Sequence, residues 1–206
     1  MPTITFSALL FSFAMILSCA QAELPDIQSF KDKTTKLYST DGNPKAKGVR
    51  LSFSYPKAWN THDDLKPNVA QRFTNINSDS RAIMKLVIKE FPVDLEGVSD
   101  DDLKNVYQSP EAKKRMSAAG MDIQHIQATK WSGQRAIIMD YHCTLAEDGV
   151  NQNAACVELQ IFYKGFLVGL QFMVFGPEDY AILDKKLVEL TPTFILLSES
   201  IAFKDS

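Results

Sequence analysis

Histidines and cysteines are the residues of this sequence best suited to metal binding or nucleophilic catalysis, and the chain has three of each. His62, His125 and His142 are widely separated, and none has a second ligand at helical spacing. His142 directly precedes Cys143, but adjacent strand residues point to opposite faces of a sheet, so this imidazole is poorly placed to activate the thiol. The sequence therefore predicts no metal site and no cysteine nucleophile.

The sequence also lacks the motifs of serine nucleophiles and of phosphate-binding loops. Trp131-Ser132-Gly133 is without the flanking pattern of a nucleophile elbow, and the nine glycines mark turns rather than a phosphate-binding loop. The acidic run 100–102 fits the first turn of a helix better than a cation site. We therefore predict no catalytic residue, no cofactor and a protein that is not an enzyme. A hydrolase assembled from distant residues is the alternative, and it would show as a cleft of groups with shifted pKa values.

The first 22 residues have the pattern of a signal peptide. The apolar run from Leu9 to Leu17 has the length of a signal-peptide core and is too short to span a bilayer. Ala20-Gln21-Ala22 gives the small-x-small pattern that precedes cleavage, which would make Glu23 the first mature residue. The n-region departs from the usual pattern because it has no lysine or arginine. We expect an exported protein, either periplasmic or secreted.

Cys19 offers a second interpretation of the same segment. Ile16-Leu17-Ser18-Cys19 resembles a bacterial lipobox, in which the cysteine is lipidated and becomes the new N-terminus. Leucine is unusual at the second position, and the site after Ala22 competes. Lipid anchoring to an envelope membrane is therefore the alternative to a free exported protein. No other stretch reaches about 20 apolar residues, so we expect no transmembrane span in the mature chain.

Removal of the signal peptide leaves Cys143 and Cys156, and an even pair in an exported chain predicts a disulfide. The two cysteines flank a polar loop at the facing ends of two expected strands. In the chain-entropy picture such a bond contributes about 3 kcal/mol. Simple alternation puts Cys143 on the apolar face and Cys156 on the polar face, so a bulge or an early strand end is needed to bring them together.

Composition indicates one ordinary globular domain with an N-terminal extension. Of the 206 residues, 45% are apolar and 23% are charged, and the formal net charge is −3. No basic block stands out, so we expect no nucleic-acid partner. We divide the chain into the signal peptide 1–22, a polar leader or tether 23–47, and a single domain 48–206. A short helix from Ile27 to Leu37 is expected in the leader.

Hydrophobic periodicity predicts an α+β fold. Alternation predicts a three-stranded antiparallel meander between Trp131 and Phe175, with a turn at Lys164-Gly165. Further strands and helices are expected at 49–55, 70–76, 82–91 and 123–131, and at 99–120 and 182–201, respectively. Pro192 should kink or restart the last helix. The expected architecture is an antiparallel sheet of about six strands flanked by helices.

The opening of the domain carries a resemblance. The segment from Gly48 to Trp59, GVRLSFSYPKAW, is similar to the opening strand of PsbP-like and Mog1-like domains, and the likeness extends over roughly 48–203. The resemblance implies an α/β/α sandwich around an antiparallel sheet. In bacteria such domains occur as small exported proteins and lipoproteins of the DcrB-like kind and as cytoplasmic chaperones. They are largely binding and assembly factors, and no catalytic residue carries over.

These observations together favour a non-enzymatic exported factor that binds another protein, within an unspecified assembly. The alternative is a small-molecule or lipid carrier that uses a cavity between the sheet and its helices.

Overall fold

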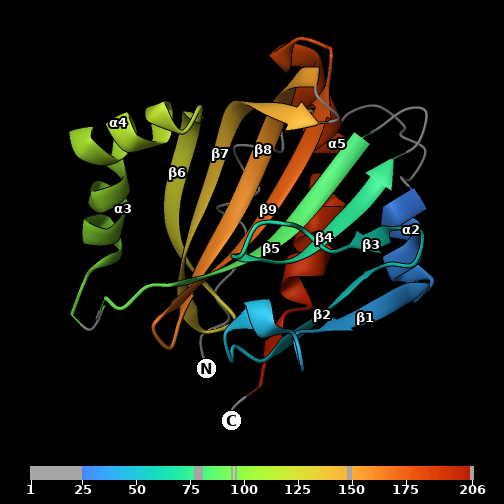
Figure 1. Ribbon diagram of the computed structural model, residues 1–206, viewed down its shortest axis with the longest axis horizontal. Helices are drawn as coiled ribbons and strands as arrows, with labels where there is room; N and C mark the ends of the chain where they lie inside the picture. Colours follow the sequence, from blue (N-terminus) through green and yellow to red (C-terminus); the bar gives the residue numbers. More distant parts are fainter. Residues whose placement is uncertain (1–24, 77–80, 94, 96, 148–149, 205–206) are drawn as a thin grey trace.

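The computed structural model describes residues 25–76, 81–93, 95, 97–147 and 150–204. Cys19, the expected cleavage site between Ala22 and Glu23, and the turn 77–80 lie outside the described residues. The elements, in chain order (Figure 1), are α2 (Pro25–Lys31), β1 (Thr35–Ser39), η2 (Pro44–Ala46), β2 (Leu51–Pro56), β3 (Asn60–His62), β4 (Val69–Ile76), β5 (Arg81–Glu90), α3 (Asp100–Gln108), α4 (Pro110–Ala118), β6 (Asp122–Trp131), β7 (Gln134–Glu147), β8 (Val150–Tyr163), β9 (Phe166–Gly176), α5 (Tyr180–Glu199) and β10 (Ala202–Phe203).

A seven-stranded antiparallel sheet is the centre of the fold, and its strand order is β3-β4-β5-β9-β8-β7-β6. The expected α+β class with an antiparallel sheet is confirmed. The opening strand β2 belongs instead to a separate three-stranded sheet of order β1-β2-β10. In the leader, the helix ends at Lys31, so the expectation of a helix to Leu37 is wrong, because Thr35–Ser39 pairs with β2.

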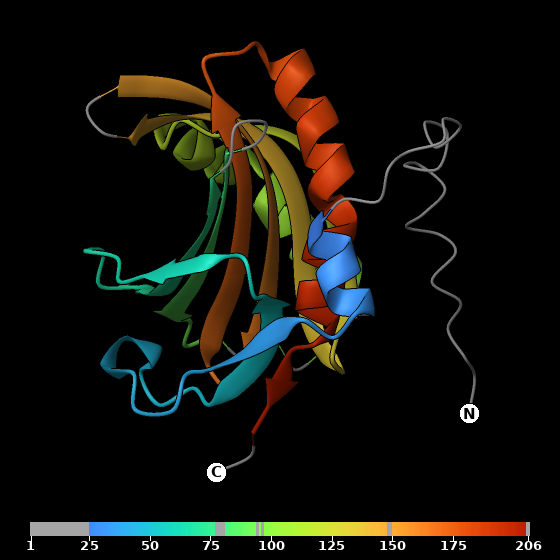
Figure 2. The same ribbon diagram turned by 90° about the vertical axis from the view of Figure 1, so that its right-hand side faces the viewer.

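Helices cover both faces of the large sheet. In Figure 2, α2 and α5 lie side by side against one face, which we call the α5 face. Its buried core includes Leu159, Phe172 and Leu190. The opposite, α3 face buries a second core that includes Met139 and Met173 together with Leu103 from α3. A sheet buried on both sides needs strands that are largely apolar on both faces, as β5 is between Ala82 and Ile88 with the exception of Lys85.

Two tight hairpins set the register of β6, β7, β8 and β9. Ser132-Gly133 joins β6 to β7, and Lys164-Gly165 joins β8 to β9. The φ angles are +49° and +76° in the first turn and +47° and +78° in the second. Positive φ at both central residues defines the turn that matches the twist of antiparallel strands, and glycine adopts it at little cost. The expected Lys164-Gly165 turn is confirmed.

The last helix is continuous. Its buried stripe recurs at helical spacing and consists of Leu183, Leu187, Leu190, Phe194 and Leu197. Pro192 lies inside α5, so the expected restart of the helix at this proline is wrong. The sequence pattern also places Ile182 on the apolar stripe, but in the structure it lies off the stripe and is 45% exposed.

Aromatic rings join the small sheet to the large one. Phe53 of β2 lies 5.4 Å from Phe73 of β4 between ring centroids, and Tyr38 of β1 contacts both rings. Trp59 stacks on Phe172 with centroids 5.8 Å apart. The aromatic residues of the opening segment are therefore core residues, which explains their pattern as a fold signature.

Candidate functional site

β6 forms one end of the seven-stranded sheet and pairs with β7 alone. It is ten residues long, whereas β3 at the other end has three. Its register with β7 shifts between Ile123 and His125, which is a bulge at Gln124. Because of this extra residue, Ile123 and Ile126 both join the core of the α3 face. β6 is thus a long edge strand with two isoleucines on one side.

The α3–α4 helix pair lies beside β6, and capping residues set where each of the two helices begins. Ser99 accepts a hydrogen bond from the Asp102 backbone, and the Asp102 carboxylate accepts one from the Ser99 backbone, so α3 starts with a capping box. Ser109 caps α4, and Pro110 follows at its first position. Within α3 and α4 the one buried residue is Leu103. Most side chains of the pair are therefore at least partly exposed to solvent.

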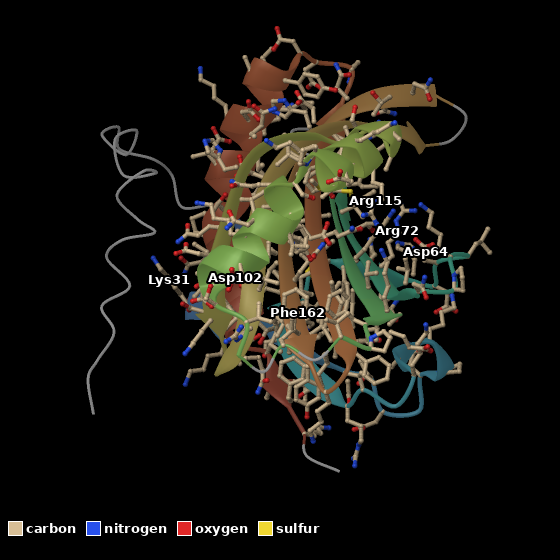
Figure 3. All side chains as sticks on the ribbon, turned by 90° about the vertical axis from the view of Figure 1, so that its left-hand side faces the viewer. Lys31, Asp64, Arg72, Asp102, Arg115 and Phe162 are labelled. Carbon is tan, nitrogen blue, oxygen red and sulfur yellow. The ribbon has the colours of Figure 1, made fainter. Side chains whose placement is uncertain are left out.

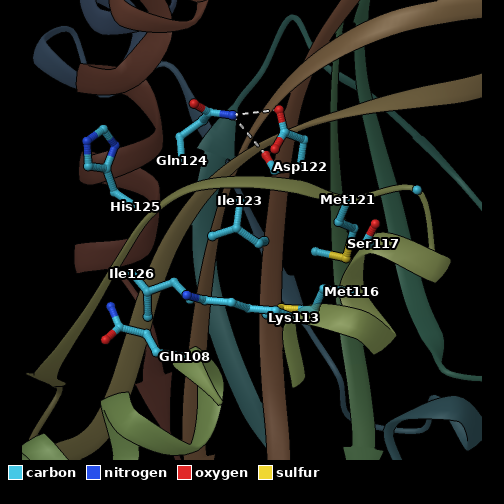
Figure 4. Close-up of a pocket in the computed structure, with 11 residues that line it drawn as sticks. Gln108, Lys113, Met116, Ser117, Met121, Asp122, Ile123, Gln124, His125 and Ile126 are labelled. Carbon is cyan, nitrogen blue, oxygen red and sulfur yellow. Dashed lines mark hydrogen bonds between the residues drawn. The ribbon is translucent and has the colours of Figure 1, made fainter. Parts of the chain in front are cut away.

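A groove of about 560 Å³ separates α4 from β6. Its apolar lining is Met116, Met121, Ile123 and Ile126, and its polar lining includes Lys113 and Gln124. We call this hollow the β6–α4 groove. Figure 4 shows Ile123 and the two methionines pointing into it, with the Lys113 side chain crossing it toward Ile126. Gln124 donates to the carboxylate and the backbone carbonyl of Asp122 at the rim.

Charge divides the helix pair into two ends. The first turn of α3 carries three aspartates, whereas α4 carries Lys113, Lys114 and Arg115 against Glu111. Figure 3 shows Asp102 and Arg115 at opposite ends of the pair. Within the described residues, no ion pair involves the three basic side chains, and all three are exposed. The helix beside the groove is therefore a basic surface.

The structure brings the predicted disulfide residues together as thiols. The Sγ atoms of Cys143 and Cys156 lie 3.6 Å apart. Their hydrogen bond lowers the pKa of the Cys143 thiol, whereas the same bond and burial raise the pKa of Cys156. Both side chains lie on the α3 face. The register of β7 with β8 is regular there, so the expected bulge is absent from this pair of strands.

Each histidine has a partner on a neighbouring element rather than a place in a common site. His62 contacts the Thr74 hydroxyl at 2.9 Å, and His125 contacts the Asp140 carboxylate at 2.8 Å. His142 stacks on Tyr180 of α5 and contacts Asp184 at 2.8 Å. Among the described residues, no cluster of three histidine, cysteine or acidic side chains is arranged to hold a metal ion.

Carboxylates with shifted pKa values lie in structural contacts. Lys204, then Arg50 and Ser39, hydrogen-bond Asp41 and hold its pKa well below the usual range. The Ser99 hydroxyl lowers the pKa of Asp102 in the capping box. Lys186 lowers the pKa of Glu178 through a 2.6 Å contact. These carboxylates stabilise the C-terminal segment and the starts of helices, and they do not converge on the groove.

A buried polar network on the α3 face was not predicted from the sequence. Glu158 is 3% exposed and accepts hydrogen bonds from Gln160 at 2.7 Å, Gln171 at 2.9 Å and Tyr141 at 3.3 Å. Tyr107 of α3 donates to Gln160 at 2.5 Å. Burial, and then the nearby Glu158 charge, raise the pKa of both tyrosines. The network thus ties α3 to the sheet through paired polar groups.

Comparison with solved structures decides the fold. The solution structure of cyanobacterial PsbP (CyanoP) from Synechocystis sp. PCC 6803 matches 92% of this chain and 99% of its own, with a TM-score of 0.51 and 16% identity. The chain has a PsbP-like fold. The resemblance of the opening segment is thereby confirmed at the level of the fold.

Two further structures match the PsbP-like fold of this chain more loosely. LpqN, described as involved in cell envelope biogenesis of Mycobacterium tuberculosis, covers 85% of this chain and 94% of its own at 12% identity and a TM-score of 0.45. PA94 of Pseudomonas aeruginosa, described as a putative regulator of unknown function, covers 84% and 99% at 13% identity and a TM-score of 0.41. No family model and no curated protein sequence matches the chain.

Two hollows lie at the periphery of the described PsbP-like fold. One is the β6–α4 groove, and the other, of about 570 Å³, lies between the segment around Phe91 and the turn Lys164-Gly165. Neither lies between the sheet and α5, where Phe172 and Phe194 pack 5.5 Å apart between ring centroids. Within the described residues, none of the helices has the length and apolar character needed to cross a bilayer.

Proposed function

We propose that this chain is a non-enzymatic, exported factor that binds another protein, as a component or assembly partner in the cell envelope. The observation that carries the proposal is the long outer edge of β6 with the β6–α4 groove beside it. An edge strand and an adjoining apolar hollow are features by which proteins bind polypeptide segments. The signal-peptide pattern of residues 1–22 supports export.

The proposal that the protein is not an enzyme is supported by the structural roles of its histidine and carboxylate side chains. His142 anchors α5, and Asp41 ties β1 to the segment after β10. The carrier alternative gains less support, because the interface between α5 and the sheet is filled by buried side chains, among them Leu187 and Phe172.

Recovery of a partner tests the function. The mature chain, residues 23–206, carries a C-terminal tag and is used to capture proteins from the envelope fraction of its own organism, with identification by mass spectrometry. One stoichiometric partner, competed by untagged protein, is the expected result. Bait without any stoichiometric protein, or with a co-purifying lipid or metabolite alone, overturns the proposal in favour of a carrier.

The mass of the mature N-terminus tests export separately. Cleavage after Ala22 gives an unmodified chain that begins at Glu23, and this is the expected species. A diacylated Cys19 at the new N-terminus would instead establish lipid anchoring.

A further inference from the structure

We propose that the β6–α4 groove binds an extended, acidic segment of a partner protein, which pairs with the outer edge of β6 as an additional strand. The proposal deepens the protein-binding function and rests on it. It assigns the surface, the backbone conformation of the bound segment and the sign of its charge.

The backbone of β6 supplies the first argument. Within the described residues, the backbone N–H and C=O groups of Asp122 to Lys130 form hydrogen bonds with the strand β7 and, at the Asp122 carbonyl, with the side chain of Gln124. An edge strand points alternate N–H and C=O groups away from its sheet, and an extended peptide satisfies them by adding a strand. From His125 to Trp131 the register with β7 is regular. This stretch is therefore long enough to template a strand.

The groove supplies anchor pockets for that strand. Ile123 and Ile126 lie on the side of β6 that faces α4, and Met116 and Met121 line the opposite wall. All four side chains are partly exposed rather than buried. Side chains of an added strand alternate between faces, so every second side chain would enter the groove and contact these apolar residues. Methionine adapts its shape readily, which suits a site that accepts aliphatic side chains of different sizes.

Charge gives the sign of the bound segment. α4 carries three basic residues and one acidic residue, so its net charge is 3 − 1 = +2. The basic side chains are exposed and outside the ion pairs of the described residues. Charges within about 8 Å still interact at physiological salt, so acidic residues of the ligand are attracted. A second copy of this chain would instead bring another basic α4 to the same edge.

Selection from short random peptides displayed on phage tests the chemistry without knowledge of the partner. The immobilised mature chain is expected to enrich peptides in which Asp or Glu alternates with Val, Ile or Leu. An enriched peptide is then synthesised with a fluorescent label, and its binding is measured by anisotropy. The variant K113E/K114E/R115E should bind it about tenfold more weakly or worse.

A matched variant separates local charge from net charge. K57E/K66E/K185E makes the same change in total charge at exposed lysines outside α3 and α4, and it should keep the affinity within about twofold. Met121→Arg, which puts a long charged side chain into the apolar wall of the groove, should also weaken binding about tenfold or more, because it blocks the apolar contacts. Thermal unfolding of each variant verifies that it is folded. Hydrogen exchange should show that the peptide protects those backbone amides between Ile123 and Lys130 that point away from β7.

The outcomes distinguish this surface from the general function. Failure to enrich any peptide, equal binding by K113E/K114E/R115E, or protection outside β6 overturns the groove proposal. A dimer through β6 in sedimentation, lost in Met121→Arg, would replace the partner by a second copy. If the protein captured from the envelope binds K113E/K114E/R115E as well as the unchanged chain, the protein-binding function stands and the groove assignment fails.

Discussion

The Sγ atoms of Cys143 and Cys156 lie 3.6 Å apart although the two residues are not partners in the β7–β8 register. Cys143 pairs with Ala154, and Cys156 pairs with Tyr141, so the thiols meet along a diagonal. Residues two positions apart on one strand share a face, which places Cys143, Ala154 and Cys156 together. The diagonal thus allows a side-chain contact without any bulge between the strands.

We predict that oxidation joins Cys143 to Cys156 and raises stability. The residues are separated by 13 positions, and a crosslink of this span contributes about 3 kcal/mol in the chain-entropy model. The thiols must approach from 3.6 Å to about 2.05 Å, which requires small side-chain movements. Urea unfolding of the oxidised protein, compared with the same protein plus dithiothreitol, measures the effect.

Cys143→Ser provides the control for this prediction, because it removes the crosslink and leaves the buried Cys156 in place. Reductant should then have no effect on the urea midpoint. Two titratable thiols per chain after exposure to air and a glutathione redox buffer would contradict the prediction.

We predict that Asp41→Asn lowers stability near neutral pH and has no such effect in acid. Lys204, Arg50 and Ser39 bind the carboxylate and lower its pKa in the folded state. A group with a depressed folded pKa stabilises the fold above its unfolded pKa, about 3.9, and this stabilisation is lost as pH falls through the folded pKa. The difference in urea midpoint should therefore be full at about pH 7 and shrink below about pH 4.

Asp63→Asn, at another exposed aspartate, is the comparison for Asp41 and should change the midpoint little at any pH. A deficit of Asp41→Asn that persists unchanged into acid would show that the contact acts through shape rather than charge.

The sequence predicted the strands and helix starts well because these depend on local signals. Ser99 and Ser109-Pro110 are start signals that act within one turn of helix, and Lys164-Gly165 satisfies a local backbone need. The assignment of Cys156 to a polar face was wrong for a non-local reason. Both faces of β8 are covered, so Ala155 and Cys156 are both buried and alternation carries no information there.

The β6–α4 groove and the Glu158 network could not be predicted from local sequence patterns. Glu158 and Gln160 alternate with Val157 and Leu159, which is the pattern of a solvent-facing polar side. In the fold this side faces α3, and the polar groups are satisfied by one another and by Tyr107. The edge position of β6 depends on strand order across the whole sheet, which no window of sequence contains.

We predict that Phe172→Ala destabilises the fold by about 3–5 kcal/mol. Phe172 is 0% exposed and lies between Trp59 and Phe194. The three rings come from three different parts of the chain. Truncation leaves a cavity between the sheet and α5 that these rigid rings cannot fill. Urea unfolding measures the loss, and Leu65→Ala, at a fully exposed leucine, should change stability by less than about 0.5 kcal/mol. A loss for Phe172→Ala as small as that of Leu65→Ala would contradict the packing described here.

The contact between His142 of β7 and Tyr180 of α5 is predicted to be energetically coupled. The rings are stacked with centroids 4.2 Å apart and planes 9° apart, and Tyr180 donates to the backbone carbonyl of Cys143. Stacked rings contribute about 0.5–1.5 kcal/mol beyond their buried area, so His142→Ala and Tyr180→Ala should be non-additive by that amount. A double-mutant cycle from urea unfolding measures the coupling, and Asp184→Ala separates the ring contact from the hydrogen bond to His142. Because this contact ties the first turn of α5 to the sheet, each substitution should also speed amide exchange in that turn while leaving α3 unchanged. Strict additivity of the two substitutions, together with unchanged exchange in α5, would show that the stack does not anchor the helix.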